Sequence, residues 1–303
     1  MTGRHFLDLD DVQRSAVEAL IARARGFKRG IAGAAGRLRG KLVLGMFFEP
    51  STRTATSFAA AAYRLGATWH DFGAGFSSMN KGETIADTMH TVRAIGADAI
   101  VVRHWESGYP HALAEHFNGS ILNAGDGAHA HPTQGVLDAM TLIEEFGTLV
   151  GRRVVICGDV RHSRVARSSA RAAWLLGANV TLCAPPLLLP RGDPGWGFAD
   201  LSTSLDACSG DADALMLLRV QTERGDSSEL PPSGDLIEGY GLTAERLERL
   251  PAHCIIMHPG PVNRDVEVAA SLIRVERSRI DRQVENGVYV RMAVLEGALK
   301  DAA

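Results

Sequence analysis

The chain has 303 residues, of which 46% are hydrophobic and 22% are charged, and its formal net charge at pH 7 is −3. This length exceeds what one ordinary hydrophobic core supports, so we expect two domains of roughly 130–150 residues each. The mildly acidic balance excludes the strongly basic surface of a nucleic-acid-binding protein and the polybasic patch of a membrane-binding protein. Positive charge at an anion site must therefore come from local clustering of arginine and lysine.

The N-terminus and the cysteines predict a cytoplasmic protein with reduced thiols. Residues 1–11 contain no apolar signal-peptide core, and no stretch reaches about 18 consecutive apolar residues. The cysteines are scattered singly through the second half of the chain, without a C-x-x-C pair. We expect reduced core thiols at Cys157, Cys183, Cys208 and Cys254.

Apolar runs alternate with helical patterns through the first half of the chain. A first helix, capped by Asp10 or Asp11, is expected to extend through Ala24. Strands are then expected at 42–48, 68–72, 99–103 and 120–123, and helices at 54–65, 84–95 and 110–117. Repeated strand-then-helix order with short connections predicts a parallel, doubly wound sheet.

A helix from Pro132 to about Gly147 precedes a second alternation. Its strands are expected at 153–157, 179–184, 214–218 and 254–258, with a helix near 164–176. Residues 224–250 are polar and rich in glycine and proline, so we expect a mobile excursion there rather than part of the sheet.

These elements predict an α/β protein with two doubly wound domains, each a parallel sheet flanked by helices. The first domain is expected to cover residues 1–135 and the second residues 150–285. A C-terminal helix, within residues 288–303, is expected to return to the first domain.

The stretch from Phe47 to Thr54 joins a buried strand to the first turn of a helix, and it includes Ser51, Thr52 and Arg53. The first N–H groups of a helix have no intrahelical partner, and the macrodipole adds partial positive charge. Ser51 alone is explained by an ordinary N-cap. Arg53 favours a phosphate site, because a hydrogen bond to a charged group contributes about 1.5–3 kcal/mol and the dipole only about 0.3–1 kcal/mol.

Other polar residues follow strand ends, where open α/β sheets bind their ligands. Arg103 ends an apolar strand, so it is either a surface arginine or the partner of an anion. His131 and Gln134 are three positions apart at a helix start and face one region. The helix N-terminus disfavours cationic His131, so its neutral imidazole can donate to a carbonyl; a helix cap is the alternative.

Two arginines in the second half suit a substrate with two carboxylates. Arg164 follows a strand and opens a helix, and Arg219 ends the strand expected at 214–218. A guanidinium binds a carboxylate in bidentate fashion. The G-x-G-x-x-G fingerprint is absent, which argues against a nucleotide-dependent dehydrogenase. Arg167 and Arg171, on the same helix, are expected to form a solvated face.

Seven motifs carry a family resemblance: FFEPSTRT, SSMNKGET, VVRH, NAGDGAHAHPTQ, GDVRHSR, LLRVQTER and HPGPVNRD. In this order and spacing, over about residues 5–300, the chain resembles the catalytic chain of the aspartate carbamoyltransferase family. The resemblance implies carbamoyl phosphate and L-aspartate as substrates, a place in pyrimidine biosynthesis, no cofactor and no metal. It also implies a homotrimer with shared active sites.

The resemblance assigns the site residues by substrate. The phosphate ligands would be Ser51, Thr52, Arg53, Thr54 and Arg103, and the carbamoyl oxygen would contact Thr54, Arg103 and His131. The carbamoyl amide would be held by Gln134 and by the main-chain carbonyls around Pro259 and Gly260. From a neighbouring subunit, Ser77 would reach carbamoyl phosphate, and Lys81 would act in catalysis and in aspartate binding. The aspartate carboxylates would bind Arg164, Arg219 and Gln221.

Two helical positions depart from the family pattern: Ala55 stands where arginine is frequent, and Ala59 where glutamate is frequent. Loss of both resembles deletion of one exposed ion pair, worth about 0–1 kcal/mol, so we expect activity to survive.

Three alternatives stay open. An ornithine carbamoyltransferase shares the phosphate half, but its usual H-C-L-P turn is replaced by His258-Pro259-Gly260-Pro261. A carbamoyltransferase for another amino acid is the second. A non-catalytic scaffold in a dihydroorotase complex is the third. The sequence leaves open whether trimers assemble further, with regulatory chains or dihydroorotase.

Overall fold

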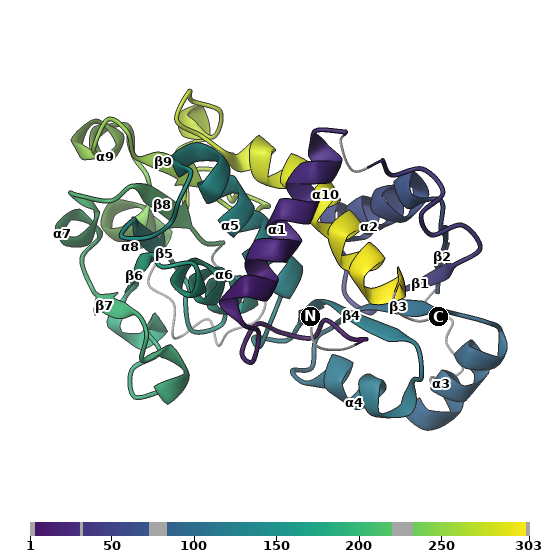
Figure 1. Cartoon of the computed structure of the whole chain (residues 1–303). Helices are drawn as coiled ribbons and strands as arrows, with labels where there is room; N and C mark the ends of the chain where they lie inside the picture. Colours follow the sequence, from purple (N-terminus) through teal and green to yellow (C-terminus); the bar gives the residue numbers. More distant parts are fainter. Residues whose placement is uncertain (1–3, 31–32, 73–83, 220–232, 301–303) are drawn as a thin grey trace. The chain divides into compact units, whose positions relative to one another are not determined.

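The computed structural model describes residues 4–30, 33–72, 84–219 and 233–300. The chain divides into two compact units, one of Met1–Leu137 with Val284–Ala303 and the other of Asp138–Gln283 (Figure 1). Each contains a parallel sheet flanked by helices, so the predicted fold class is confirmed. The division falls inside two helices, α5 (Pro132–Phe146) and α10 (Ile280–Lys300).

The sheet of unit 1 has the strand order β2-β1-β3-β4, and all its pairings are parallel. Its strands are β1 (Leu42–Phe47), β2 (Thr68–Asp71), β3 (Ala99–His104) and β4 (Ser120–Asp126). Its connecting helices are α2 (Thr52–Leu65), α3 (Ile85–Ala94) and α4 (Tyr109–His116). From β1 the chain passes to β2 on one side and later to β3 on the other, so the direction of winding reverses between β1 and β3.

The central strands form because they can be buried on both faces. In β3, Ala99 through Val102 are fully buried, as near-continuous apolar runs are in parallel sheets. Leu44 and Met46 of β1 pack with Val102 and with the α3 residue Val92 in one hydrophobic cluster. Capping also defines α3, since Thr84 and Asp87 form a reciprocal capping box at its start.

Unit 1 also contains α1 (Arg14–Lys28), which lies beside the C-terminal part of α10 (Figure 1). Arg23 and Arg37 both bond the Glu296 carboxylate on α10. The expected N-cap was wrong: Gln13, not Asp10 or Asp11, occupies that position, and its side chain makes no capping bond. Asp10 instead donates its main-chain N–H to Asp8 in the preceding turn.

The sheet of unit 2 has the strand order β7-β6-β5-β8-β9, again with parallel pairings. Its strands are β5 (Arg153–Cys157), β6 (Asn179–Cys183), β7 (Asp200–Ser202), β8 (Ala214–Leu217) and β9 (Ile255–Met257). Its α-helices are α6 (Arg164–Leu175), α7 (Leu205–Ser209), α8 (Ser233–Tyr240) and α9 (Ala244–Arg249). Its described residues also form the 3-10 turns η3 (Pro186–Leu188), η4 (Pro194–Trp196) and η5 (Ala270–Leu272).

Three expectations about unit 2 and α10 need correction. The polar segment expected to be a mobile excursion contains α8 and α9, and Thr243 caps α9 through the N–H of Arg246. The C-terminal helix begins at Ile280 rather than near residue 288. Arg171 is half-buried rather than fully solvated, because its guanidinium packs over the rings of Trp174 and Phe198.

The cysteines are free thiols, as predicted, and Cys157, Cys183 and Cys254 are buried while Cys208 is partly buried. Burial raises the pKa of the Cys254 thiol to about 11, so it stays protonated at neutral pH. Among the described helices, none is long and apolar enough to cross a membrane.

Candidate active site

The sheet of unit 1 brings two of the predicted site segments together. Phe47, at the end of β1, is the register partner of Arg103 in β3. The turn that leaves β1 therefore begins beside Arg103, at the point where the winding reverses. Open α/β sheets bind ligands at such switch points, outside the carboxyl ends of the strands.

The turn after β1 leads into α2, and the hydroxyl group of its N-cap residue does not cap the helix. Ser51 takes the N-cap position in an extended conformation (φ −156°, ψ 90°), but its side chain makes no capping hydrogen bond. Ser51 is therefore the N-cap residue of α2 by position, but its hydroxyl does not act as a cap. Thr52 and Arg53 are exposed, whereas Thr54 is buried. Exposed donors on a helix N-terminus can meet an anion from solvent.

Thr54 is the link between this turn and the start of α5. Its Oγ1 lies 3.5 Å from Nε2 of His131, which is buried like Gln134. The main-chain carbonyl of His131 accepts from the N–H groups of Gln134 and Gly135, so this residue lies at the N-terminus of α5. Thr54 and His131 thus lie side by side in unit 1.

Arg103 is held by a residue that the sequence analysis did not assign. Its Nε donates to Oε2 of Glu49 over 3.2 Å, and the two side chains are only 17% and 14% exposed. Glu49 comes from the same turn as Ser51. The sequence does show a carboxylate directly before the Pro-Ser-Thr-Arg run. Its pairing with Arg103 could not be predicted, because the pairing depends on the strand order.

The end of β3 is rigid. His104 stacks on Tyr109 with ring centroids 3.7 Å apart and an interplanar angle of 6°. Its Nδ1 accepts from the main-chain N–H of Glu106, and burial lowers the pKa of His104. A neutral, packed His104 supports the strand that carries Arg103.

Unit 2 repeats the switch-point arrangement between β5 and β8. Gly158 follows β5 with φ 131°, and a Cβ there would lie 2.9 Å from the carbonyl oxygen of Leu218, so glycine is required. Ser163 then caps α6 through the N–H of Ala166, which leaves Arg164 as the first helical residue, 3% exposed. Arg219, half-buried, follows β8. The two arginines predicted for carboxylates therefore follow neighbouring strands.

The segment after β9 forms a tight turn. His258 is buried, and its Nδ1 accepts from the N–H of Gly260 over 2.8 Å. Gly260 has φ 68°, in the region that favours glycine, and Pro259 and Gly260 are both partly exposed. The Pro259 and Gly260 carbonyls, which are predicted to hold an amide, thus belong to a turn that the buried His258 ring stabilises.

The remaining predicted site residues are not described. Ser77, Lys81 and Gln221 lie outside the described residues. Within the described ranges, no three His, Cys, Asp or Glu side chains form a group that could hold a metal ion.

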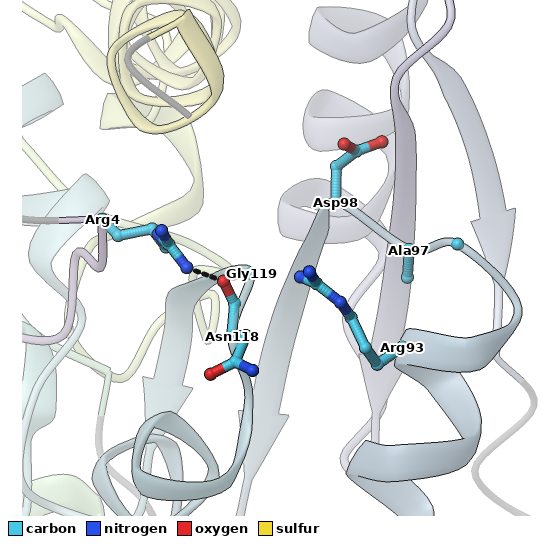
Figure 2. Close-up of a pocket in the computed structure, with 7 residues that line it drawn as sticks. Arg4, Arg93, Ala97, Asp98, Asn118 and Gly119 are labelled. Carbon is cyan, nitrogen blue, oxygen red and sulfur yellow. Dashed lines mark hydrogen bonds between the residues drawn. The ribbon is translucent and has the colours of Figure 1, made fainter. Parts of the chain in front are cut away.

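A separate pocket of about 330 Å³ opens at the opposite, amino ends of the strands of unit 1. Figure 2 shows Arg4 and Arg93 on opposite sides of it, with Asp98 nearby. The main-chain N–H groups of Gly96, Ala97 and Asp98 already donate to carbonyls of the protein, and the Asp98 carboxylate bonds Lys41. Its main chain thus offers little to an anion, and we assign no substrate to this pocket.

Two family models match the chain. Residues 4–144 match the carbamoyl-phosphate-binding domain of aspartate/ornithine carbamoyltransferases, and residues 150–297 match their aspartate/ornithine-binding domain. The chain is 53% identical over 258 residues to an aspartate carbamoyltransferase catalytic subunit of Acidothermus cellulolyticus, covering 85% of this chain and 80% of the relative. It is 47% identical to that of Myxococcus xanthus, covering 97% of this chain and 98% of the relative.

Solved structures of similar fold come from Trypanosoma cruzi. Its aspartate transcarbamoylase in complex with carbamoyl phosphate and aspartate matches with a TM-score of 0.87 and 29% identity, covering 97% of this chain and 96% of that one. The same enzyme in complex with N-(phosphonacetyl)-L-aspartic acid matches with a TM-score of 0.84 and 28% identity, covering 97% and 95%.

Proposed function

The chain belongs to the aspartate/ornithine carbamoyltransferase family, and from this membership we propose that it transfers the carbamoyl group of carbamoyl phosphate to L-aspartate. The products are N-carbamoyl-L-aspartate and phosphate. The curated relatives reported above are aspartate carbamoyltransferases, which favours aspartate over ornithine as the acceptor.

The observation that carries the proposal is the grouping of Arg103, the Ser51–Thr54 turn and His131 at the carboxyl ends of the unit 1 strands. We assign the phosphate to Ser51, Thr52, Arg53, Thr54 and Arg103. We assign the carbamoyl oxygen to Thr54, Arg103 and His131, and the amide to Gln134 and the carbonyls of Pro259 and Gly260.

We assign the aspartate carboxylates to Arg164, Arg219 and Gln221. Support comes from the position of the two arginines after neighbouring strands and from the bidentate fit of guanidinium to carboxylate. Ornithine, whose side chain is a cation, gains nothing from a second arginine.

The reaction is a direct displacement. The neutral α-amino group of aspartate attacks the carbamoyl carbon, a tetrahedral intermediate forms, and its C–O bond to phosphate breaks. Donors at Thr54, Arg103 and His131 stabilise the oxyanion, a contribution of about 2.7–4 kcal/mol for a single donor. Orientation of two anionic substrates contributes up to roughly 7–11 kcal/mol more.

The amine proton goes to the departing phosphate, so no dedicated protein base is needed. The pH–rate profile is then expected to follow ionisation of the substrates. A profile that follows a protein side chain, and moves when that side chain is replaced, would contradict this step.

We also propose a homotrimer that acts in the cytoplasm in pyrimidine biosynthesis. In it, Ser77 and Lys81 of one subunit complete the active site of its neighbour, and Lys81 contacts aspartate. The support is the SSMNKGET motif, which the chain shares with the family.

A crystal structure with N-(phosphonacetyl)-L-aspartic acid tests these assignments together. Its phosphonate stands for phosphate, its carbonyl for the carbamoyl group and its aspartyl part for the acceptor. We expect the phosphonate on the Ser51–Thr54 turn and Arg103, the carboxylates on Arg164 and Arg219, and Lys81 from a second subunit. Carboxylates bound elsewhere, or a site without a second subunit, would overturn the respective assignment.

A further inference from the structure

Unit 2 contains a buried chain of hydrogen bonds that starts at Asp138 on α5. The Asp138 carboxylate is 1% exposed. Its Oδ2 accepts from the hydroxyl of Ser169 over 2.5 Å, and its Oδ1 accepts from Nε2 of Gln283 over 2.8 Å. Burying a carboxylate is costly unless hydrogen bonds compensate, so the Ser169 hydroxyl and the Gln283 amide stabilise the buried Asp138 carboxylate.

The second part of the chain leads from Gln283 to the turn after β9. Oε1 of Gln283 accepts from the main-chain N–H of His258 over 3.0 Å. Nδ1 of His258 in turn accepts from the N–H of Gly260. Gln283 and His258 are 2% and 1% exposed, so water does not compete for these bonds.

The charge of Asp138 sets the orientation of the Gln283 amide. An ionised carboxylate can only accept, so the Gln283 amide must turn its NH₂ toward Asp138 and its oxygen toward His258. That oxygen then holds the His258 N–H, and the ring accepts from Gly260. The position of the His258 main chain, where the turn to Gly260 begins, thus depends on a residue more than a hundred positions earlier in the sequence.

We propose that Asp138 is a positioning residue: through Gln283 it orients the Pro259 and Gly260 carbonyls toward the carbamoyl amide. Through Ser169 it also fixes α6, the helix that Arg164 opens. This inference rests on the proposed function, in which those carbonyls hold the amide of carbamoyl phosphate. Asp138 itself touches no substrate.

The distinctive consequence concerns two ligands that share a phosphate. Carbamoyl phosphate carries the amide that the turn binds, whereas inorganic phosphate lacks it. Loss of the Asp138 interaction should therefore weaken carbamoyl phosphate selectively and leave inorganic phosphate unchanged. A purely structural role for Asp138 would lower stability without changing the ratio of the two dissociation constants.

The test measures both dissociation constants by calorimetry for Asp138→Asn, Gln283→Glu and the double variant. In Asp138→Asn the new amide can reverse Gln283, so carbamoyl phosphate should bind about tenfold more weakly, a loss of about 1.4 kcal/mol. Gln283→Glu places two carboxylates next to each other, so this variant should bind carbamoyl phosphate more weakly still. The double variant exchanges donor and acceptor: the amide at position 138 donates to the carboxylate at position 283, which accepts from the His258 N–H, so the ratio should recover.

Asp213→Asn is the matched control. Asp213 is a largely buried carboxylate of unit 2 that accepts hydrogen bonds from Arg152 and from the N–H of Arg153, at the amino ends of β5 and β8. This substitution should lower the melting temperature and leave the ratio of the two dissociation constants at its wild-type value. The role of Asp138 would be overturned if the single variants kept the wild-type ratio of the two dissociation constants. It would also be overturned if the double variant recovered the wild-type stability but not that ratio.

Wild-type turnover separates this inference from the proposed function. If the wild-type enzyme does not carbamoylate aspartate, the proposed function fails. If it does, and the variants keep the wild-type ligand ratio, only the role of Asp138 fails.

Discussion

Nε of Arg103 lies 3.2 Å from Oε2 of Glu49, and both side chains are mostly buried. The guanidinium assigned to the phosphate is thus neutralised by a carboxylate of the same turn that carries the other phosphate ligands. An incoming anion must share Arg103 with Glu49 or displace it.

The first prediction is that Glu49→Gln strengthens the binding of inorganic phosphate. It removes one negative charge beside the site while keeping side-chain shape, and two charges about 4 Å apart interact by about 4 kcal/mol near a protein surface. We expect the dissociation constant, measured by calorimetry, to fall by about tenfold, or about 1.4 kcal/mol. An unchanged or larger constant would show that Glu49 does not compete with the anion.

The second prediction concerns Arg53. Arg53→Ala should reduce kcat/KM by about 10²–10³-fold, the loss typical of one transition-state donor. Arg93→Ala is the matched control, because Arg93 is an exposed arginine of the same unit beside the pocket at the amino ends of the strands. Equal losses of kcat/KM in the two variants would contradict the assignment of Arg53 to the active site.

Much of this site was predictable because polar residues follow apolar strands. Ser51 to Thr54 and Arg103 follow such runs, and parallel strands bring their carboxyl ends to one edge. The Glu49 partner was not predictable, since it depends on β1 lying beside β3. The bonds of Asp138 to Ser169 and Gln283 depend on helix packing that no local pattern encodes.

The same reasoning explains what was missed in the fold. The predicted strands with long apolar runs all formed, as in β3 and β8. The three-residue β7 is largely exposed, and the short helices α7 and α9 have too few turns for a clear periodic pattern. Their caps, such as Ser204 on the N–H of Ala207, were the available signal.

The third prediction separates the two substrates. Arg219→Ala should raise the KM for aspartate roughly 10- to 100-fold, because one charge-assisted pair contributes about 1.5–3 kcal/mol. The dissociation constant of inorganic phosphate should stay within about twofold, because Arg219 is not among the residues assigned to phosphate. A proportionate loss of phosphate affinity would contradict the assignment of Arg219 to aspartate.

The fourth prediction concerns stability and pH at Glu296. Burial alone would raise the pKa of this carboxyl, but the hydrogen bond from Arg23 and the charges of Arg23, Arg37 and Lys300 outweigh it, so the pKa is lowered. A lowered folded-state pKa contributes stability that is present above the ordinary value of 4.5 and is lost as pH falls through the folded-state pKa. Glu296→Gln should therefore cost about 1.5–3 kcal/mol at neutral pH.

Urea unfolding of the wild type and Glu296→Gln at pH 7 and below pH 4.5 checks this directly. The difference in unfolding free energy between the two proteins should shrink at the lower pH. A difference that is the same at both pH values would mean that the charge of Glu296 does not provide the stabilisation.

The most direct test of the central claim is a steady-state assay with carbamoyl phosphate and either L-aspartate or L-ornithine as acceptor. We expect carbamoyl aspartate and phosphate to form in equal amounts, with little or no transfer to ornithine. Preferential carbamoylation of ornithine, or no transfer to aspartate by folded protein, would contradict the account.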